Sequence, residues 1–297
     1  MKKHRKRFHP IPLLLLALLL LGVWWGNNSI RTEEFSFTAP RLPEAFEGFR
    51  VVQLTDLHGK QFGEGNARLI EAVAAAEPDL IALTGDFVDA HSDLSDLTPL
   101  IEGLVPLAPV YYVTGNHEWA SGQALTVVHA LRDLGVVCLE NSFEPVERGG
   151  ERILVAGIHD PNGFADQKKP EQLAEELRAF DDGAFRLLLA HRNNWFNGRY
   201  CRLGADLTLS GHAHGGVWRL PFTDGLINTE GTLFPSYTSG FYQCTDGGHE
   251  PATVFVSRGL GNSPHWVFRL FNRPQVAVIT LHTSKGSCYA RIQRRTI

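Results

Sequence analysis

Nine polar side chains with the chemistry of metal binding and proton transfer follow short apolar segments of this 297-residue chain. Carboxylates, imidazoles and a carboxamide together suit Zn²⁺, Mn²⁺ or Fe, rather than the all-oxygen shells of Ca²⁺ or the thiolate shells of structural zinc. The mixture therefore predicts a catalytic metal site. The side chains fall into five blocks: Asp56 and His58 in TDLHG, Asp86 and Asp89 in TGDFVD, Asn116 and His117 in TGNHE, His191 in LLLAH, and His212 and His214 in SGHAHGG.

The number of candidate ligands bears on the number of metal ions. One ion that keeps a coordination position open for substrate cannot use seven protein ligands, so we expect two ions that share a carboxylate. The candidate ligands are Asp56, His58, Asp86, Asn116, His191, His212 and His214.

The elements that position these residues follow from the apolar pattern. Buried strands are predicted over 49–56, 79–86 and 109–116, and helices over 66–77, near 95–105 and over 121–135. Asp56, Asp86 and Asn116 are each 30 residues apart, which is the length of a βαβ unit. Because neighbouring parallel strands end at the same sheet edge, we expect these three residues to lie side by side.

The second half of the chain is richer in strands. We predict strands over 152–158, 184–191, 206–212, 252–257 and 275–281, a helix near 170–179, and long loops over 159–170 and 215–250. Residues 29–48 are expected to form a polar connector with an edge strand that tethers the domain. No repeat or composition break divides residues 33–297, so we expect one domain there.

The N-terminus has the character of a membrane anchor. Five basic residues within positions 2–7 precede the uncharged segment 11–26. As a helix this segment would span about 24 Å, near the length at which signal peptides and membrane spans overlap. The absence of a small-residue cleavage site and the pair Trp24 and Trp25 favour an uncleaved signal-anchor, with secretion after cleavage as the alternative. The positive-inside rule then places residues 1–32 as a cytoplasmic tail and span, with residues 33–297 outside the cytoplasmic membrane.

The charge of residues 33–297 and the cysteine spacing argue against several kinds of partner and site. Residues 33–297 hold 22 basic and 32 acidic residues, so nucleic acid is not expected as a partner. The four cysteines lack the C-x-x-C spacing of zinc knuckles and thioredoxin-like sites. Disulfides and free buried thiols both remain open.

The five blocks D-x-H, G-D-x-x-D, G-N-H-E, a lone His and G-H-x-H resemble those of the calcineurin-like metallophosphoesterases in order and rough spacing. The resemblance covers about residues 33–282, and the segments 254–263 and 269–281 are similar to the membrane-anchored bacterial YkuE-type branch. It implies a four-layer α/β/β/α sandwich of two mixed β-sheets. It also implies a metal-bridging hydroxide that hydrolyses a phosphoester or pyrophosphate bond, and the anchor favours a lipid-linked or cell-wall substrate.

The resemblance also implies individual roles. Asp86 would bridge the two ions, His117 would contact the phosphoryl group and protonate the leaving oxygen, and Asp89 would orient His117. The block around His191 departs from the family's H-x-P version, and we take Arg192 and Asn193 in the following loop as candidate substrate contacts. One ion would be held by Asp56, His58, Asp86 and His214, and the other by Asp86, Asn116, His191 and His212.

Most of these residues also have a structural interpretation. Asp56, Asp86 or Asn116 alone would serve as a helix N-cap, and Glu118 is expected to be a local capping group. Glycines 211, 215 and 216 are expected to permit close backbone approach to the ions and substrate. The alternative function is a non-catalytic metal-binding or protein-interaction module on the same fold, which a filled set of ligand positions disfavours.

Overall fold

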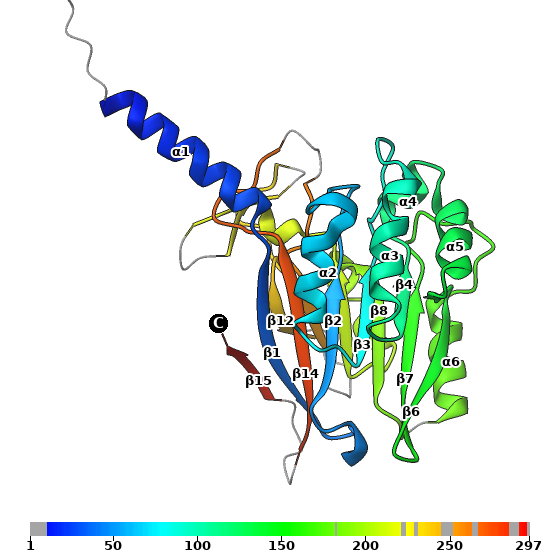
Figure 1. Cartoon of the computed structure of the whole chain (residues 1–297). Coiled ribbons are helices and arrows are strands. Elements are labelled where there is room, and N and C mark those ends of the chain that lie inside the picture. The colour runs from blue at the N-terminus through cyan, green and yellow to red at the C-terminus, as the bar shows by residue number, and fades with distance from the viewer. Residues whose placement is uncertain are drawn as a thin grey trace, which may run out of the picture.

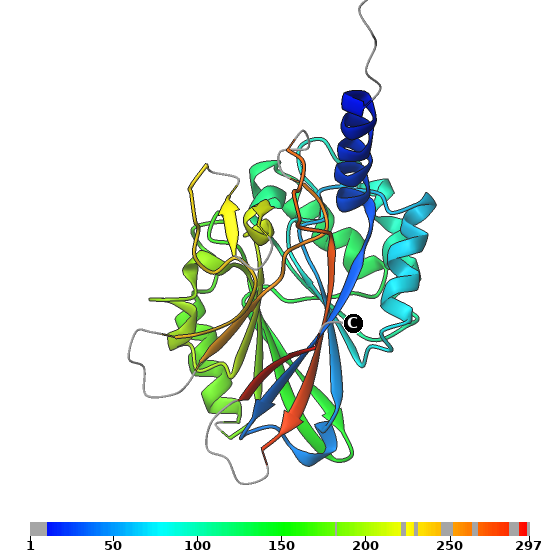
Figure 2. The same cartoon turned by 90° about the vertical axis from the view of Figure 1, so that its left-hand side faces the viewer.

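Two large β-sheets face each other, and helices cover both outer faces (Figures 1 and 2). The computed structural model describes residues 11–181, 183–220, 224–228, 231–244, 252–262 and 267–284, together with the backbone of 291–295. The predicted basic tail, residues 1–10, lies outside the described residues.

The first sheet carries the parallel strands that were expected to form one edge. β2, β3, β4 and β5 are parallel neighbours, and the register pairs Leu54 with Leu83 and Thr84 with Val113. The residues that follow these strands therefore emerge together. In the described part of the chain the strand order is β15 (Arg291–Arg295), β1 (Arg31–Ala39), β14 (Gln275–Thr283), β2 (Phe49–Leu54), β3 (Leu80–Thr84), β4 (Val110–Val113) and β5 (Val137–Cys138).

The second sheet is also mixed. Its central strands β7, β8, β9 and β13 are parallel, and an antiparallel strand closes each side. A separate hairpin pairs β10 (Trp218–Arg219) with β11 (Gly225–Ile227). The order is β12 (Gly240–Gln243), β13 (Thr253–Val256), β9 (Leu207–Gly211), β8 (Arg186–Arg192), β7 (Glu151–Ile158) and β6 (Ser142–Arg148).

The α-helices are α1 (Ile11–Asn28), α2 (Ala67–Ala74), α3 (Thr98–Leu104), α4 (Asn116–Ala120), α5 (Ala124–Asp133) and α6 (Pro170–Phe180). Short 3₁₀ turns are η1 (Glu44–Phe46), η2 (Glu64–Asn66), η3 (Leu94–Asp96), η4 (Asn193–Trp195), η5 (Tyr200–Arg202) and η6 (His214–Gly216).

Successive side chains of a strand point to opposite faces of the sheet, so each sheet contributes to two apolar cores. Val52 and Leu54 point to the core under α2, α3 and α5, whereas Val51 points to the core between the sheets. A third apolar cluster lies between the second sheet and α6. Three cores separate four layers, so the predicted α/β/β/α sandwich is confirmed.

Some local expectations were wrong. The strand in the 29–48 connector is not an edge strand, because β1 pairs with β14 on one side and β15 on the other. Only Ser29 and Ile30 separate α1 from β1, so this segment joins the helix directly to the sheet. The predicted 215–250 loop contains β10, β11 and β12, whose short segments lack a clear apolar alternation.

Helix α1 is the one helix in the described part of the chain that is long and apolar enough to cross a membrane. Its leucines and both of its tryptophans are exposed to solvent along the helix.

Among the cysteines, Cys201 and Cys244 form a disulfide that joins η5 to the segment after β12. Cys138 is free, and burial raises the pKa of its thiol to about 12. Cys288 lies outside the described residues.

Candidate metal centre

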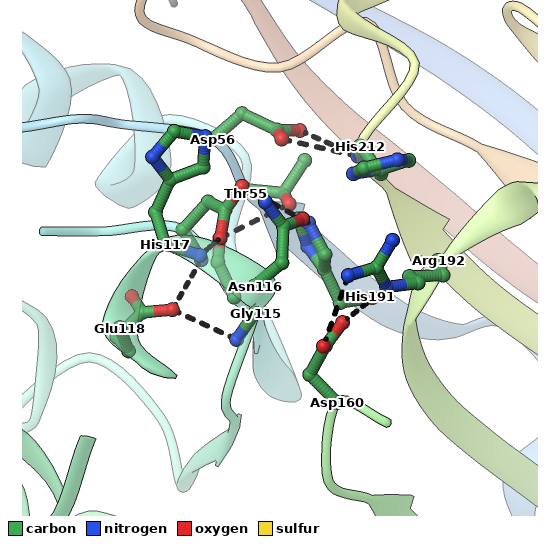
Figure 3. A network of polar contacts seen from close by, with 12 residues as sticks. Thr55, Asp56, Gly115, Asn116, His117, Glu118, Asp160, His191, Arg192 and His212 are labelled. Carbon is green, nitrogen blue, oxygen red and sulfur yellow. Dashed lines mark hydrogen bonds and ion pairs between the residues drawn. The ribbon is translucent and has the colours of Figure 1, made fainter. Parts of the chain in front are cut away.

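The candidate ligands come from the ends of strands in both sheets. Asp56, Asp86 and Asn116 follow β2, β3 and β4, whereas His191 lies in β8 and His212 follows β9. Strands of both sheets therefore contribute candidate ligands. Figure 3 shows the side chains of Asp56, Asn116, His191 and His212 facing a common centre.

Three potential ligand atoms converge around Asp86, which is 1% exposed. Its Oδ2 lies 3.1 Å from Nε2 of His191, and Oδ1 of Asn116 lies 3.1 Å from the same nitrogen. Nδ1 of His191 donates to the carbonyl of Thr84 at 2.8 Å, because a carbonyl can only accept. In the neutral imidazole Nε2 then carries a lone pair. This nitrogen therefore faces two electron-rich oxygens, Oδ2 of Asp86 and Oδ1 of Asn116.

This arrangement is suited to a cation. Burial lowers the pKa of His191, but the charge and hydrogen bond of Asp86 outweigh it and raise that pKa to about 10. The electrostatics thus favour positive charge between His191 and Asp86. A divalent ion supplies that charge while leaving both Nε2 and Oδ2 as ligands, so these residues fit a metal.

A second group of candidate ligand atoms lies on the other side of Asp86. Nε2 of His58 is 3.3 Å from Nε2 of His214, and His214 Nε2 is 3.6 Å from Oδ1 of Asp56. Nε2 of His58 is also 3.9 Å from Oδ2 of Asp86. Asp86 therefore faces both groups, which is the position that the bridging role requires. The ligand atoms of Asp56, His58 and His214 all lie within 4.8 Å of one another, as do those of Asp86, His191 and His212.

Protein contacts hold the two carboxylates in place. Oδ1 of Asp86 accepts the backbone N–H of His117 at 2.8 Å. Asp56 accepts the backbone N–H of His212 through both oxygens, at 3.0 and 3.1 Å. This second contact ties the turn after β9 to the turn after β2, and so links the two sheets directly at the site (Figure 3).

Backbone strain concentrates at the same positions. Five of the seven candidate ligands have a left-handed φ between 47° and 66°, although none is glycine. Non-glycine residues adopt this region at a cost, and it is found preferentially at functional sites. The strained residues are Asp56, His58, Asp86, His212 and His214.

Glu118 is a fully buried carboxylate that organises the loops of the first sheet. It accepts backbone N–H groups of Asp86, Phe87 and Val88 at 3.0, 2.7 and 3.3 Å, and of Gly115 at 2.8 Å. It therefore acts across two loops, which goes beyond the local cap that the sequence suggested. Burial and the charge of Asp86 raise its pKa to about 7.

His117 and Asp89 both lie beside the candidate ligand His58. The His117 and His58 rings meet edge to face with centroids 4.7 Å apart, and Oδ2 of Asp89 is 3.6 Å from Nδ1 of His58. The candidate ligand atoms of the three residues lie within 4.8 Å of one another. Asp89 is thus placed to orient His58, and its expected orientation of His117 stays a prediction.

Arg192 and Asn193 are engaged by the protein itself. Nε and Nη2 of Arg192 donate to the buried carboxylate of Asp160 at 2.7 and 3.2 Å, and Nδ2 of Asn193 donates to the carbonyl of Tyr237 at 2.7 Å. Figure 3 shows the guanidinium of Arg192 between Asp160 and His212. Sequence reasoning missed Asp160, although it follows β7 as the candidate ligands follow their own strands.

Glycines permit close backbone packing at the site, but not all of them face it. A Cβ on Gly211 would overlap Thr55 and Asp56, and one on Gly115 would overlap Asp86. Gly215 and Gly216 instead pack against Asn272 and Gly225, with φ of 64° and 67°. A side chain at either position would therefore meet protein atoms, and the expected approach of their backbone to the ions stays a prediction.

A family model described as "Calcineurin-like phosphoesterase" matches residues 49–216, which is more than half of the chain. The chain belongs to the calcineurin-like phosphoesterase family. It is a metal-dependent phosphoesterase, a hydrolase that acts on ester bonds.

Individual relatives extend the likeness beyond the matched region. The chain is 28% identical over 86% of its length to "Uncharacterized metallophosphoesterase YkuE" of Bacillus subtilis, of which 87% is covered. It is 28% identical, again over 86% of its length, to "Transmembrane protein with metallophosphoesterase domain" of Danio rerio, of which 59% is covered.

Among solved structures, the protein TT1561 of Thermus thermophilus is similar with a TM-score of 0.46 at 15% identity, covering 72% of this chain and 90% of that one. A dimetal phosphatase from Danio rerio gives 0.45 at 13% identity, covering 79% and 99%.

Proposed function

We propose that this chain is a dinuclear metallophosphoesterase that hydrolyses a phosphoester or pyrophosphate bond with two divalent ions, Mn, Zn or Fe. The observation that carries the proposal is that Asp86 Oδ2 and Asn116 Oδ1 each lie 3.1 Å from His191 Nε2, so that three atoms able to bind a metal gather at one buried point when His191 is neutral. His58 and His214 offer a second such point on the other side of Asp86. The ions would polarise the phosphoryl group and make a bound water acidic.

The chain's own residues would divide the remaining work. Asp56 and Asp86 would hold negative charge near the ions, fixed by the backbone N–H groups they accept. His117 is half-buried beside His58 and has its backbone fixed by Asp86, so its imidazole would bind the phosphoryl group and deliver a proton to the leaving oxygen. Arg192, held by Asp160, would supply positive charge at the rim next to His212, and Asn193 would fix the loop around Tyr237.

We further propose that residues 1–32 form a cytoplasmic tail and signal-anchor and that residues 33–297 act outside the cytoplasmic membrane. The exposed apolar surface of α1 supports membrane insertion. The Cys201–Cys244 disulfide supports an oxidising compartment, since such bonds are rare in the cytosol. Alkylation of protein released from intact membranes should leave Cys201 and Cys244 unmodified until a reductant is added.

The experiment that tests the proposal is turnover by the purified full-length protein in detergent. A chromogenic phosphodiester and a monoester are assayed with Mn²⁺ and with a chelator, beside the variants Asp86→Asn and His117→Ala. We expect metal-dependent turnover that both variants lose, with Asp86→Asn also losing bound metal and His117→Ala retaining it. A folded, metal-loaded wild type without turnover on a broad phosphoester panel would favour the binding module.

A further inference from the structure

The end of the apolar helix is locked to the catalytic domain by a buried amide. Asn27, the last buried residue of α1, donates from Nδ2 to the carbonyl of Arg269 at 3.0 Å and accepts the backbone N–H of the same residue at 2.7 Å. Asn262 donates to its Oδ1 at 3.1 Å, and Arg273 donates to the carbonyls of Ser29 and Ile30 at 3.1 and 2.7 Å. The helix therefore meets the domain at a fixed place.

That place adjoins the metal centre. The fully buried guanidinium of Arg269 donates to the carbonyls of Arg258 and Gly261, and its Nη2 lies 3.4 Å from Nδ1 of His214. An open cavity of about 340 Å³ is lined by Asn27 and Asn28 of α1. The same cavity is lined by the candidate ligand His58, with Lys60 and His91. The helix end and this candidate ligand therefore share one opening.

An exposed apolar surface lies at the same end of the molecule as this helix end (Figure 2). Outside α1, the described part of the chain has eight exposed large apolar side chains, and five of them lie in two connected segments, one of which contacts Asn27. Trp218 packs on Phe268 with ring centroids 5.5 Å apart, Arg219 donates its backbone N–H to Leu270, and Ile227 bridges to Leu233. Figure 2 shows these segments and α1 at the same end of the molecule. We call this surface the apolar collar: Leu220, Leu233, Phe234, Phe268 and Phe271.

The two most exposed members of the collar are held outward at a cost in backbone energy. Phe234 is 74% and Phe271 is 65% exposed, and their φ values are 50° and 51°. A bulky residue in the left-handed region is strained, and strain of this kind marks positions with a function. Removing their rings from water would offset part of the cost.

The length of α1 brings the collar within reach of a bilayer. Eighteen residues of helix span about 27 Å, slightly less than the ~30 Å hydrocarbon core. Trp24 and Trp25 lie at the end of the helix nearest the domain, and Arg273 lies over the Trp25 ring at 4.5 Å, a combination typical of the membrane–water interface. With a two-residue connector, the collar meets the interface when α1 is inserted.

We infer that the apolar collar docks on the lipid bilayer beside α1, so that the opening lined by Asn27 and His58 faces the membrane. The substrate is then an amphiphile whose phosphoester headgroup stands at the bilayer surface and enters that opening from the membrane plane. Lys60 and His91 line that opening and offer it nitrogen hydrogen-bonding groups. This substrate class rests on the proposed function, whereas the docking of the collar does not.

The docking is tested by photolabelling. The full-length chain is reconstituted in dioleoylphosphatidylcholine nanodiscs that contain a phosphatidylcholine with a diazirine in one acyl chain, and adducts are mapped by mass spectrometry. We expect adducts on the peptides that carry Phe234, Phe268 and Phe271, as well as on α1. Phe180, which is 48% exposed at the end of α6, is the matched control and should stay unlabelled. A collar labelled no more than Phe180 overturns the inference.

The substrate class is tested with two matched esters in the same nanodiscs, dioleoylphosphatidyl para-nitrophenol and the soluble methyl para-nitrophenyl phosphate. The variant Phe234→Asn with Phe271→Asn removes both rings and suits the left-handed backbone, because asparagine tolerates that conformation. It should lower kcat/KM for the lipid ester about tenfold and leave the soluble ester within about twofold. Phe180→Asn should change neither ester.

The outcomes separate the inference from the proposed function. If the soluble ester is hydrolysed and the lipid ester is not, or if the double variant loses both equally, the substrate class is overturned and the proposed function stands. If the metal-loaded wild type hydrolyses neither ester, the proposed function fails and takes the substrate class with it. The photolabelling result still decides the docking in that case.

Discussion

The two sheets build their halves of the metal centre with different chemistry. In the half formed by the loops after β2, β3 and β4, buried carboxylates accept backbone N–H groups and so hold the loops in place. Glu118 alone accepts four such groups. The half on β8 and β9 consists of imidazoles, of which His191 is oriented by a carbonyl and His212 is tied to the first half through its backbone.

The difference indicates which half needs the ions. Buried carboxylates that accept N–H groups are satisfied by the protein itself, so the first half should keep its shape without metal. Burial lowers the pKa values of His212 and His214, so these rings stay neutral and offer lone pairs that a metal ion can use. The second half should therefore respond more strongly to metal removal.

Asp86→Asn should have the largest effect, because Asp86 is the residue that faces both halves. We expect kcat to fall by roughly a thousandfold or more and the bound metal to drop below two ions per chain. Steady-state kinetics and elemental analysis measure both quantities. Retention of two ions and of activity would remove Asp86 from the bridging position.

Glu118→Ala should be the most destabilising change in the first half. It leaves the backbone N–H groups of two buried loops without an acceptor, and we expect the free energy of unfolding to fall by about 3 kcal/mol. Urea denaturation of the metal-free protein gives this value. Glu118→Gln retains one acceptor oxygen and should lose less, and equal losses would mean that the loops do not depend on these hydrogen bonds.

His212→Ala should separate metal binding from folding in the second half. The backbone N–H that binds Asp56 is kept, so the metal-free protein should change in stability by less than about 1 kcal/mol. Metal affinity should fall roughly 10–100-fold, measured by competition with a chromophoric chelator. A loss of stability as large as that of Glu118→Ala would erase the contrast between the halves.

Metal removal should affect the two halves of the site differently within one molecule. Hydrogen exchange after chelation should speed up in residues 207–216 and change little in residues 84–89, because Glu118 accepts three backbone N–H groups of the latter without the ions. Equal acceleration in both segments would show that the first half also depends on metal.

Arg192→Lys should have the smallest effect. Lysine keeps the charge but cannot reproduce the two-point contact with Asp160, so we expect KM to rise about fivefold with kcat within twofold. An unchanged KM would assign Arg192 to the structure of the loop and not to substrate binding.

The same contrast explains what the sequence could predict. The 30-residue spacing of Asp56, Asp86 and Asn116 predicts their common edge, because parallel strands and crossover helices have regular lengths. The contact between His212 and Asp56 joins two sheets, and no local pattern encodes the distance between sheets. Short strands such as β10 and β11 depend on long-range pairing, and the four N–H bonds to Glu118 depend on loop shapes that propensity does not specify.

The seven candidate ligands are thus expected to hold two cations at the seam between the sheets. The most direct test is a crystal structure of the Mn²⁺-loaded protein with an anomalous difference map recorded at the manganese edge. We predict two peaks, one between His58 and His214 and one between His191 and Asn116, with Asp86 contacting both. A single peak that excludes either sheet's residues, or no peak with the seven side chains placed as they are here, would contradict the account.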